Sequence, residues 1–308
     1  MKIKNSENIN ESYYDKLSQS YANNLNDDKW CVTQFAYKVS NEYLSDYFSM
    51  LDLENKSLAT VGSSGDQIFN ALYYGSKKIT LIDGCVFAEA FIKYKMALIK
   101  TFDFKTFSKI VFYDKNIFDW KVYSKISHHL SGEIRQFFDE IMLIQYNFKL
   151  EENGIDNEWF QNYLRDCVIH RGINSNFSVF YRDSVAYNYL QKKLIENDFE
   201  IEYIHADFSE FPNRLTDKYD YIILSNVYDY ISKPKFYHIV NKLYNNNLNK
   251  KGAIQYKYYF EVSFKNLPKE ITSYKLLKTK KQVVPSDKFR NLKSFAPHFY
   301  GSVYFIEK

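Results

Sequence analysis

A short turn of small residues separates two apolar runs in the first third of the chain. Its sequence is Gly62-Ser63-Ser64-Gly65-Asp66, between the apolar run SLATV and the helical pattern DQIFNALYYG. Backbone amides at the start of a helix attract anions and polar groups, and glycine lets the backbone approach a ligand closely. An acid at position 66 repels a pyrophosphate, however, and suits an ammonium or a sulfonium. The turn therefore favours a positively charged ligand.

Two further acids end the next two predicted strands. Asp83 closes the run KKITLID and precedes Gly84, and Asp207 follows EIEYIHA and precedes Phe208. An acid at the end of the second strand can accept both hydroxyls of a ribose. An acid beside an aromatic ring can meet the amine and the ring face of adenine. With the turn, these acids predict S-adenosylmethionine rather than a nicotinamide dinucleotide as cofactor.

The segment LSNVYDYI, at the end of a fourth apolar run, supplies the candidates for catalysis. Asp229 is the candidate general base for a hydroxyl or amine acceptor. Tyr228 and Tyr230 either line the acceptor pocket and stabilise a sulfonium by cation–π contact, or pack the start of the next helix, with Asp229 as its cap. Asn226 is a candidate to hold the amino-acid part of the cofactor or to orient the acceptor, and Ser225 is a candidate cofactor-binding residue. The predicted cofactor-binding residues are Gly62, Ser63, Ser64, Gly65, Asp66, Asp83, Gly84, Asp207, Phe208, Ser225 and Asn226.

Alternating strand and helix patterns must position these residues. The patterns predict an α/β domain with a mostly parallel sheet covered by helices, because strands that alternate with helices form parallel sheets. A turn is expected at NKKG, residues 249–252. The expected strands are 57–61, 77–83, 200–207, one within 218–231, 253–260, 271–277 and 301–307; the expected helices are 66–75, 86–102, 132–148, 184–197 and 234–248.

The strand pattern is interrupted once, and its first strand comes late. Residues 1–55 are expected to form an N-terminal helical cap, because QFAYKVSNEYLSDYFSML spaces its apolar residues as a helix does. Residues 56–308 are expected to form one cofactor-binding domain. Within it, residues from about 104 to 197 show amphipathic helical patterns and no strand, which indicates a helical insertion.

The composition limits the class of protein further. The 308 residues include 41 basic and 37 acidic ones, for a net charge of +4, which is too balanced to favour a nucleic-acid partner. Cys31, Cys85 and Cys167 have no metal-binding spacing and fit a reducing compartment. No apolar run reaches the length of a membrane span. We therefore expect a cytoplasmic protein with no metal and no transmembrane segment.

The motif SSGDQIFNALYYGSKKITLID resembles the opening motif of class I S-adenosylmethionine enzymes related to bacterial diacylglyceryl-homoserine (betaine lipid) synthase. That family has a Ser-x-Gly-Asp-Asn-like turn in place of the methyltransferase glycines. The resemblance covers roughly residues 57–100 and 180–232, and it places Asp229 and Tyr230 at the family's Asp-aromatic pair. Gln67 stands where the family has Asn, and Ser225 and Asn226 stand where it has an Asp-His pair.

The resemblance implies a Rossmann-like class I methyltransferase fold with a helical insertion and extra N-terminal helices. It also implies transfer of the 3-amino-3-carboxypropyl group of S-adenosylmethionine to a small-molecule or lipid-like acceptor. Two alternatives remain open at this point: an S-adenosylmethionine-dependent methyltransferase and a non-catalytic protein that binds the cofactor. Which carbon of the sulfonium is attacked depends on the alignment of the acceptor, which no motif reveals.

Overall fold

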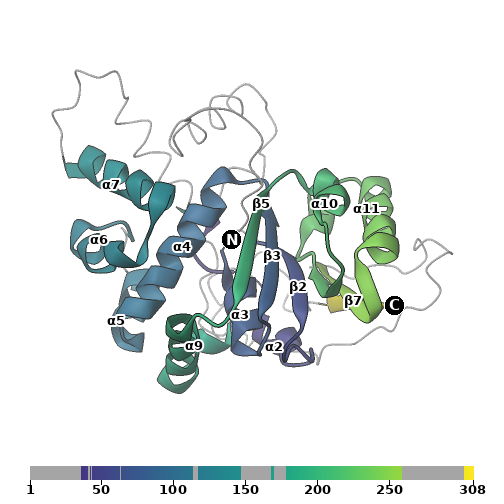
Figure 1. Cartoon of the computed structure of the whole chain (residues 1–308), viewed down its shortest axis with the longest axis horizontal. Coiled ribbons are helices and arrows are strands. Elements are labelled where there is room, and N and C mark those ends of the chain that lie inside the picture. Colours follow the sequence, from purple (N-terminus) through teal and green to yellow (C-terminus); the bar gives the residue numbers. More distant parts are fainter. Residues whose placement is uncertain are drawn as a thin grey trace, which may run out of the picture. The chain divides into compact units, whose positions relative to one another are not determined.

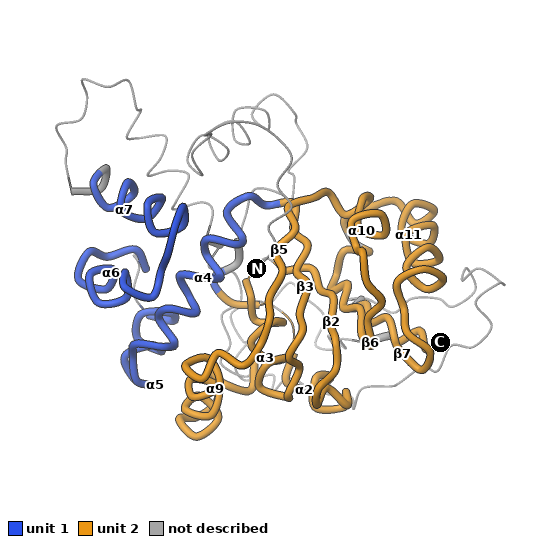
Figure 2. The backbone as a smooth tube through the Cα atoms, in the orientation of Figure 1, with its two compact units in different colours: residues 1–38, 85–170 blue, residues 39–84, 171–308 orange. Residues whose placement is uncertain are grey.

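The computed structural model describes most of the chain as two compact units (Figures 1 and 2). Unit 1 comprises residues 1–38 and 85–170, and unit 2 comprises residues 39–84 and 171–308. The described residues are 36–40, 42, 44–62, 64–113, 117–146, 168–169, 178–258 and 302–308. The strands predicted at 57–61, 77–83, 200–207, within 218–231, and at 253–260 and 301–307 all belong to unit 2. The strand predicted at 271–277 lies outside the described residues.

Unit 2 is built on a mixed sheet whose described part has six strands. Five neighbouring strands run parallel, and the sixth, at one end of the sheet, is antiparallel to its neighbour. Numbered along the chain, the parallel strands follow the order 3-2-1-4-5 of a Rossmann sheet. The predicted Rossmann-like α/β class is therefore confirmed. The strands in spatial order are β5 (Glu200–His205), β3 (Lys78–Asp83), β2 (Ser57–Val61), β6 (Tyr219–Ile223), β7 (Leu248–Tyr258) and β8 (Ser302–Glu307).

The strand order creates a switch point between β2 and β6. The chain moves outward from β2 to β3 and β5, and then returns to the other side of β2 to form β6 and β7. Because parallel crossovers are right-handed, the helices α3 (Asp66–Tyr73) and α11 (Lys233–Asn246) lie on opposite faces of the sheet. Sheets of this kind bind ligands beyond the carboxyl ends of the two strands that flank the switch point.

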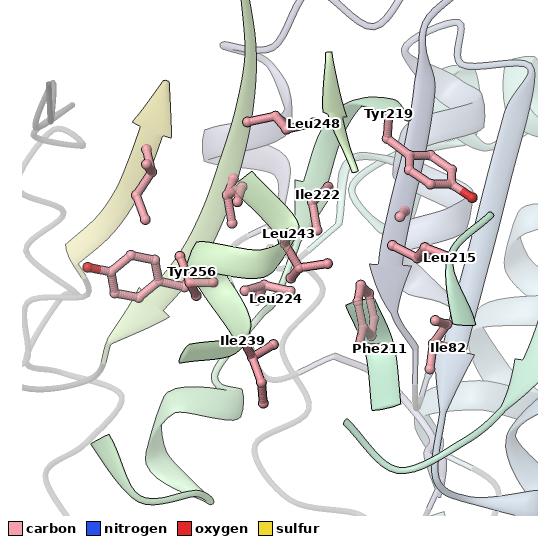
Figure 3. Close-up of a cluster of buried hydrophobic side chains, with 14 of the residues drawn as sticks. Ile82, Phe211, Leu215, Tyr219, Ile222, Leu224, Ile239, Leu243, Leu248 and Tyr256 are labelled. Atoms are coloured by element: carbon pink, nitrogen blue, oxygen red, sulfur yellow. The ribbon is translucent and has the colours of Figure 1, made fainter. Parts of the chain in front are cut away.

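Helices α10 (Phe211–Arg214) and α11 cover one face of the sheet through a hydrophobic cluster (Figure 3). The strands contribute Ala59 and Ile222, and α11 contributes Ile239 and Leu243, all of which are at most 2% exposed. Helix α3 contacts β2, and the helices α2 (Leu44–Phe48) and α9 (Ser184–Glu196) pack against α3. The 3-10 turns η5 (Val179–Tyr181), η6 (Phe208–Glu210) and η7 (Val227–Asp229) complete unit 2.

The turn predicted at residues 249–252 is part of β7 instead. Lys251 donates its backbone N–H to the carbonyl of Lys308, and Lys308 donates to the carbonyl of Gly252, both at 2.9 Å. These bonds keep the segment in the sheet despite its turn-like composition. The irregularity appears as a register shift against Tyr219–Tyr221 and as a left-handed Lys251, with φ 67°. The sequence therefore marks a bulge and not a strand boundary.

Unit 1 is mainly helical in its described part. The parallel pair β1 (Ala36–Tyr37) and β4 (Val168–Ile169) is its described sheet. β4 is a short strand within the segment expected to be an all-helical insertion, and β1 lies in the segment expected to be helical. The remaining elements are α4 (Val86–Thr101), α5 (Phe104–Ser108), the π-helix η2 (Lys109–Tyr113), α6 (Trp120–Ile126), the 3-10 turn η3 (Ser127–His129) and α7 (Gly132–Tyr146).

Aromatic side chains form the centre of unit 1. Tyr94 contacts Phe118 and Phe138 with ring centroids 5.1 and 4.6 Å apart, and its hydroxyl donates to the carbonyl of Ile117 at 2.9 Å. Rings packed at these distances stabilise a core beyond the area that they bury. Lys95 is 0% exposed in the same unit and donates its Nζ to the carbonyl of Lys38 at 2.9 Å. Unit 1 thus has its own core.

Candidate ligand site at the carboxyl edge of the sheet

The turn after β2 has the shape that its glycines allow. Gly65 precedes α3 in a left-handed conformation, with φ 75°, and donates its N–H to the carbonyl of Gly62 at 2.8 Å. A Cβ on Gly62 would lie 1.9 Å from Cδ1 of Leu81 in β3. One glycine therefore serves a backbone conformation, and the other makes room for the neighbouring strand. Ser64 is 1% exposed, and Ser63 lies outside the described residues.

Asp66 is completely buried, and its carboxylate binds two protein donors. Oδ2 accepts the backbone N–H of Ser40 and Oδ1 accepts the hydroxyl of Tyr181, each at 2.7 Å. Burial, with the Asp66 charge and hydrogen bond adding to it, raises the pKa of Tyr181 well above its ordinary value, so the hydroxyl stays a donor. The carboxylate expected to face the ligand thus joins the segment before α2 and the turn η5 to the start of α3.

Glu42 is a buried acid that the sequence patterns did not single out. It is 1% exposed, and its carboxylate accepts hydrogen bonds from the hydroxyls of Ser225 and Tyr47, the latter at 3.1 Å. Ser225 follows β6 and has a left-handed φ of 53°. The hydroxyl of Ser225 also lies 3.3 Å from Oδ1 of Asn226. Glu42 therefore lies at the carboxyl end of β6, beside the switch point.

Asp83 and Gly84 lie where the sequence predicts them, at the carboxyl end of β3. The backbone carbonyl of Asp83 accepts the N–H of Ala206, at 3.1 Å, and the carbonyl of Gly84 lies 3.0 Å from Nε2 of His205. Both residues are partly exposed. These contacts hold the ends of β3 and β5 together, so that the side chains that follow the two strands belong to one edge.

Asp207 and Phe208 follow β5 at the same edge. Asp207 caps η6 by accepting the N–H of Ser209 at 2.7 Å, and Nζ of Lys235 lies 3.9 Å from its carboxylate. Partial burial works against its ionisation, but the two hydrogen bonds from Ser209 and the charge of Lys235 outweigh that effect and lower its pKa. The ring of Phe208 stacks on Phe236 at 6.4 Å with 16° between the planes. Asp207 is thus an exposed carboxylate beside a partly buried ring.

Of the three residues proposed for catalysis, Tyr228 and Asp229 lie in η7 and Tyr230 directly follows it. Tyr228 is 6% exposed and meets the ring of Phe236 edge-on at 5.0 Å, with Tyr256 at 6.2 Å. Its ring therefore packs against the start of α11. Tyr230 is 48% exposed. Asp229 is the last residue of η7, and its side chain lies outside the described part of the structure.

The predicted residues that can be described therefore gather along one edge of unit 2. Moving across the sheet, Asp207 follows β5, Asp83 follows β3, the Gly62–Asp66 turn follows β2, and Ser225 with Glu42 follows β6. Glu42 was missed because its segment precedes the first predicted strand and carries no motif. Among the described residues, no group of His, Cys, Asp and Glu is arranged to hold a metal ion, and no helix is long and apolar enough to cross a membrane.

Comparisons with known proteins give little beyond this geometry. No protein-family model matches the sequence, and neither does any curated protein. Among solved structures, yhhF from Escherichia coli, a presumed methyltransferase, is 8% identical with a TM-score of 0.37 over 90% of this chain and 91% of its own. The rRNA methyltransferase aviRa from Streptomyces viridochromogenes is 9% identical with a TM-score of 0.36 over 82% of this chain and 77% of its own.

The N-methyltransferase NodS from Bradyrhizobium japonicum, in complex with S-adenosylhomocysteine, is 10% identical with a TM-score of 0.30 over 80% of this chain and 73% of its own. All three TM-scores are low. The fold assignment therefore rests on the strand order and register of unit 2, and the function must be argued from the side chains at its carboxyl edge.

Proposed function

We propose that this chain is an S-adenosylmethionine-dependent transferase that moves the 3-amino-3-carboxypropyl group to a small-molecule or lipid-like acceptor. The observation that carries the proposal is the order of groups along the carboxyl edge of unit 2. A partly exposed acid follows β3, an exposed acid beside an aromatic ring follows β5, and a glycine-containing turn follows β2 at the switch point. Adenosine ligands bind at such edges in Rossmann sheets.

The residues present fit the two ends of this cofactor. Asp83 has the position and exposure to accept the ribose hydroxyls, and Asp207 with Phe208 can meet adenine. The depressed pKa of Asp207 keeps its carboxylate an acceptor at neutral pH. At the other end, the buried acids Asp66 and Glu42 make the switch point unfavourable for a second phosphate. These features favour S-adenosylmethionine over a dinucleotide.

S-adenosylmethionine supplies an electrophilic carbon attached to a sulfonium. The protein must hold the acceptor in line with the bond that breaks and must remove the acceptor's proton. We assign removal of the acceptor's proton to Asp229, and we propose that the exposed Tyr230 lines the acceptor pocket. The buried ring of Tyr228 supports η7 by packing against the start of α11. Carboxypropyl transfer is preferred because of the sequence resemblance to the betaine lipid synthase group.

The by-product tests this proposal. The protein is incubated with S-adenosylmethionine and a bacterial lipid and metabolite extract, and the products are quantified by mass spectrometry. Carboxypropyl transfer releases 5′-methylthioadenosine above the rate of a protein-free control, since the free cofactor also decays to that compound. The Asp229→Asn variant should lower this release about 100-fold or more, the scale of losing a general base, without lowering cofactor affinity.

Two other results would replace the proposal with one of its alternatives. Release of S-adenosylhomocysteine instead would identify methyl transfer. Cofactor binding without either product, unaffected by Asp229→Asn, would indicate a binding protein that does no chemistry.

A further inference from the structure

We infer that Glu42 is the residue that recognises the ammonium group of the cofactor's amino-acid arm, and that Asp66 positions the segment that carries it. This inference rests on the proposed function and adds a specificity residue that no motif marks. It assigns different roles to the two buried acids at the switch point. Asp66 binds donors of the protein itself, and Glu42 binds a cation of the ligand.

Among the described residues, Glu42 has hydrogen-bond donors but no partner of opposite charge. Its two carboxylate oxygens offer about four acceptor positions, and the hydroxyls of Ser225 and Tyr47 occupy two of them. Both hydroxyls are neutral, and no lysine or arginine of the described residues pairs with Glu42. Burying a carboxylate without a cation is costly. A ligand ammonium would offset that cost, because its N–H groups can use the remaining acceptor positions.

A second buried acceptor, at the start of α3, lacks a donor among the described residues. Gln67, in the first turn of α3, is 4% exposed, and its Oε1 has no hydrogen-bond partner among the described residues. Buried side-chain oxygens are usually hydrogen-bonded. Gln67 directly follows Asp66, whose carboxylate holds Ser40, two residues before Glu42. An ammonium with three N–H donors matches an acceptor set of this kind.

The position along the sheet agrees with this assignment. β3 and β6 both flank β2, so the ends of β3 and β6 are separated by two inter-strand spacings, about 10 Å. If Asp83 holds the ribose at the end of β3, the arm of the cofactor extends past β2 toward β6. The end of that arm carries the ammonium, and Glu42 is bonded to Ser225 at the end of β6.

Asp66 fixes the course of the segment that carries Glu42. Its carboxylate accepts the N–H of Ser40, and the Oγ of Ser40 in turn accepts the N–H of Glu42 at 3.2 Å. Two consecutive hydrogen bonds therefore link the first turn of α3 to Glu42. Asp66 is a positioning residue in this arrangement, because its oxygens are engaged by Ser40 and Tyr181.

Three adenosine compounds separate the possible roles of Glu42 in a calorimetric titration. S-adenosylmethionine has both an ammonium and a sulfonium, S-adenosylhomocysteine has the ammonium alone, and 5′-methylthioadenosine has neither. Glu42→Gln keeps the size and the acceptor oxygen of the side chain and removes its charge. It should weaken binding of the first two compounds by about 10- to 100-fold and leave the third unchanged.

Glu202→Gln is the matched control. Glu202 lies within β5 and accepts the hydroxyl of Thr80 at 3.0 Å, away from the carboxyl edge, so this variant should bind all three compounds as the wild type does. Thermal unfolding of Glu42→Gln should show an unchanged or higher melting temperature, because the variant removes an uncompensated buried charge.

Each other outcome has a distinct meaning. Weaker binding of S-adenosylmethionine alone would assign Glu42 to the sulfonium and overturn the inference, as would equal affinity of wild type and Glu42→Gln for all three compounds. Failure of the wild type to bind any of them would overturn the proposed function itself, and among the outcomes of this titration only that one would do so.

Discussion

The acidic side chains at the two edges of the sheet in unit 2 differ in their exposure and in their partners. At the amino edge, Asp198 pairs with Lys77 at 2.5 Å and Asp217 pairs with Lys78 at 2.8 Å, all with largely exposed side chains. At the carboxyl edge, Glu42 is buried and bonded to neutral hydroxyls. At the amino edge, exposed acids form ion pairs with lysines. At the carboxyl edge, Glu42 is a buried acid that no lysine or arginine of the described residues pairs with.

This difference indicates which edge of the sheet has a binding role. Exposed ion pairs contribute little to stability and can be lost cheaply. A buried carboxylate without a cation lowers stability and is retained where it has another use. The comparison therefore points to the carboxyl edge as the functional one, in agreement with the switch point between β2 and β6.

The largest effect expected from a single change is on folding, at Asp66. Asp66→Ala leaves the N–H of Ser40 and the hydroxyl of Tyr181 buried without their acceptor, and should lower the free energy of unfolding by about 3–5 kcal/mol. Asp198→Ala, at the amino edge, should leave it nearly unchanged because the Lys77–Asp198 pair is exposed. Urea unfolding of both variants measures the difference.

An equal loss in the two variants would break the comparison, since it would mean that burial of Asp66 adds nothing. A sharper version uses Tyr181→Phe, which removes one donor to Asp66. Its loss of stability should be smaller than that of Asp66→Ala, because the bond from Ser40 persists.

The next effect concerns binding, at Asp83. Asp83→Ala should weaken binding of S-adenosylmethionine by about 1–3 kcal/mol, the scale of lost hydrogen bonds to a charged acceptor. Binding of S-adenosylhomocysteine and 5′-methylthioadenosine should weaken by the same factor, since all three compounds contain the ribose. Calorimetry measures each affinity, with Asp217→Ala as the amino-edge control. Unchanged affinity in Asp83→Ala would contradict the ribose assignment.

The sequence predicted the strands and most helices well, because their signals are local. The run SLATV forms β2 as predicted. The helix predicted over residues 184–197 is α9, which begins after the capping residue Asp183 and ends before the left-handed Asn197. The bulge at residues 249–252 was missed because its cause is distant: the segment stays in the sheet by bonding Lys308.

The candidate site divides in the same way. Asp83 and Asp207 were found because an acid after an apolar strand is a local pattern. Glu42 could not be found, since its contact with Ser225 joins residues far apart in the sequence, between a segment with no motif and the end of β6. The buried contacts of Asp66 were likewise beyond local patterns, because its partners come from the segment before α2 and from η5.

The smallest expected effect sharpens the description of the amino edge. Asp220 accepts the backbone N–H and the hydroxyl of Ser57, both at 3.0 Å, and an amide N–H of Asn249 at 3.1 Å. Partial burial alone would raise its pKa, but these hydrogen bonds outweigh burial and hold the pKa below its ordinary value. A depressed pKa means that the ionised carboxylate stabilises the fold above the unfolded pKa, about 4.

That stabilisation is lost as the pH falls through the folded pKa. Asp220→Asn should therefore be less stable than wild type at pH 7 by at most about 1 kcal/mol, because partial exposure screens the interaction. The gap should shrink as the pH falls below 4 and the wild-type carboxylate becomes protonated. Urea unfolding at pH 7, 5 and 3.5 measures the gap. A gap that stays constant across this range would show that the hydrogen bonds of Asp220 do not depend on its charge, and that the amino edge does not use its acids as charges.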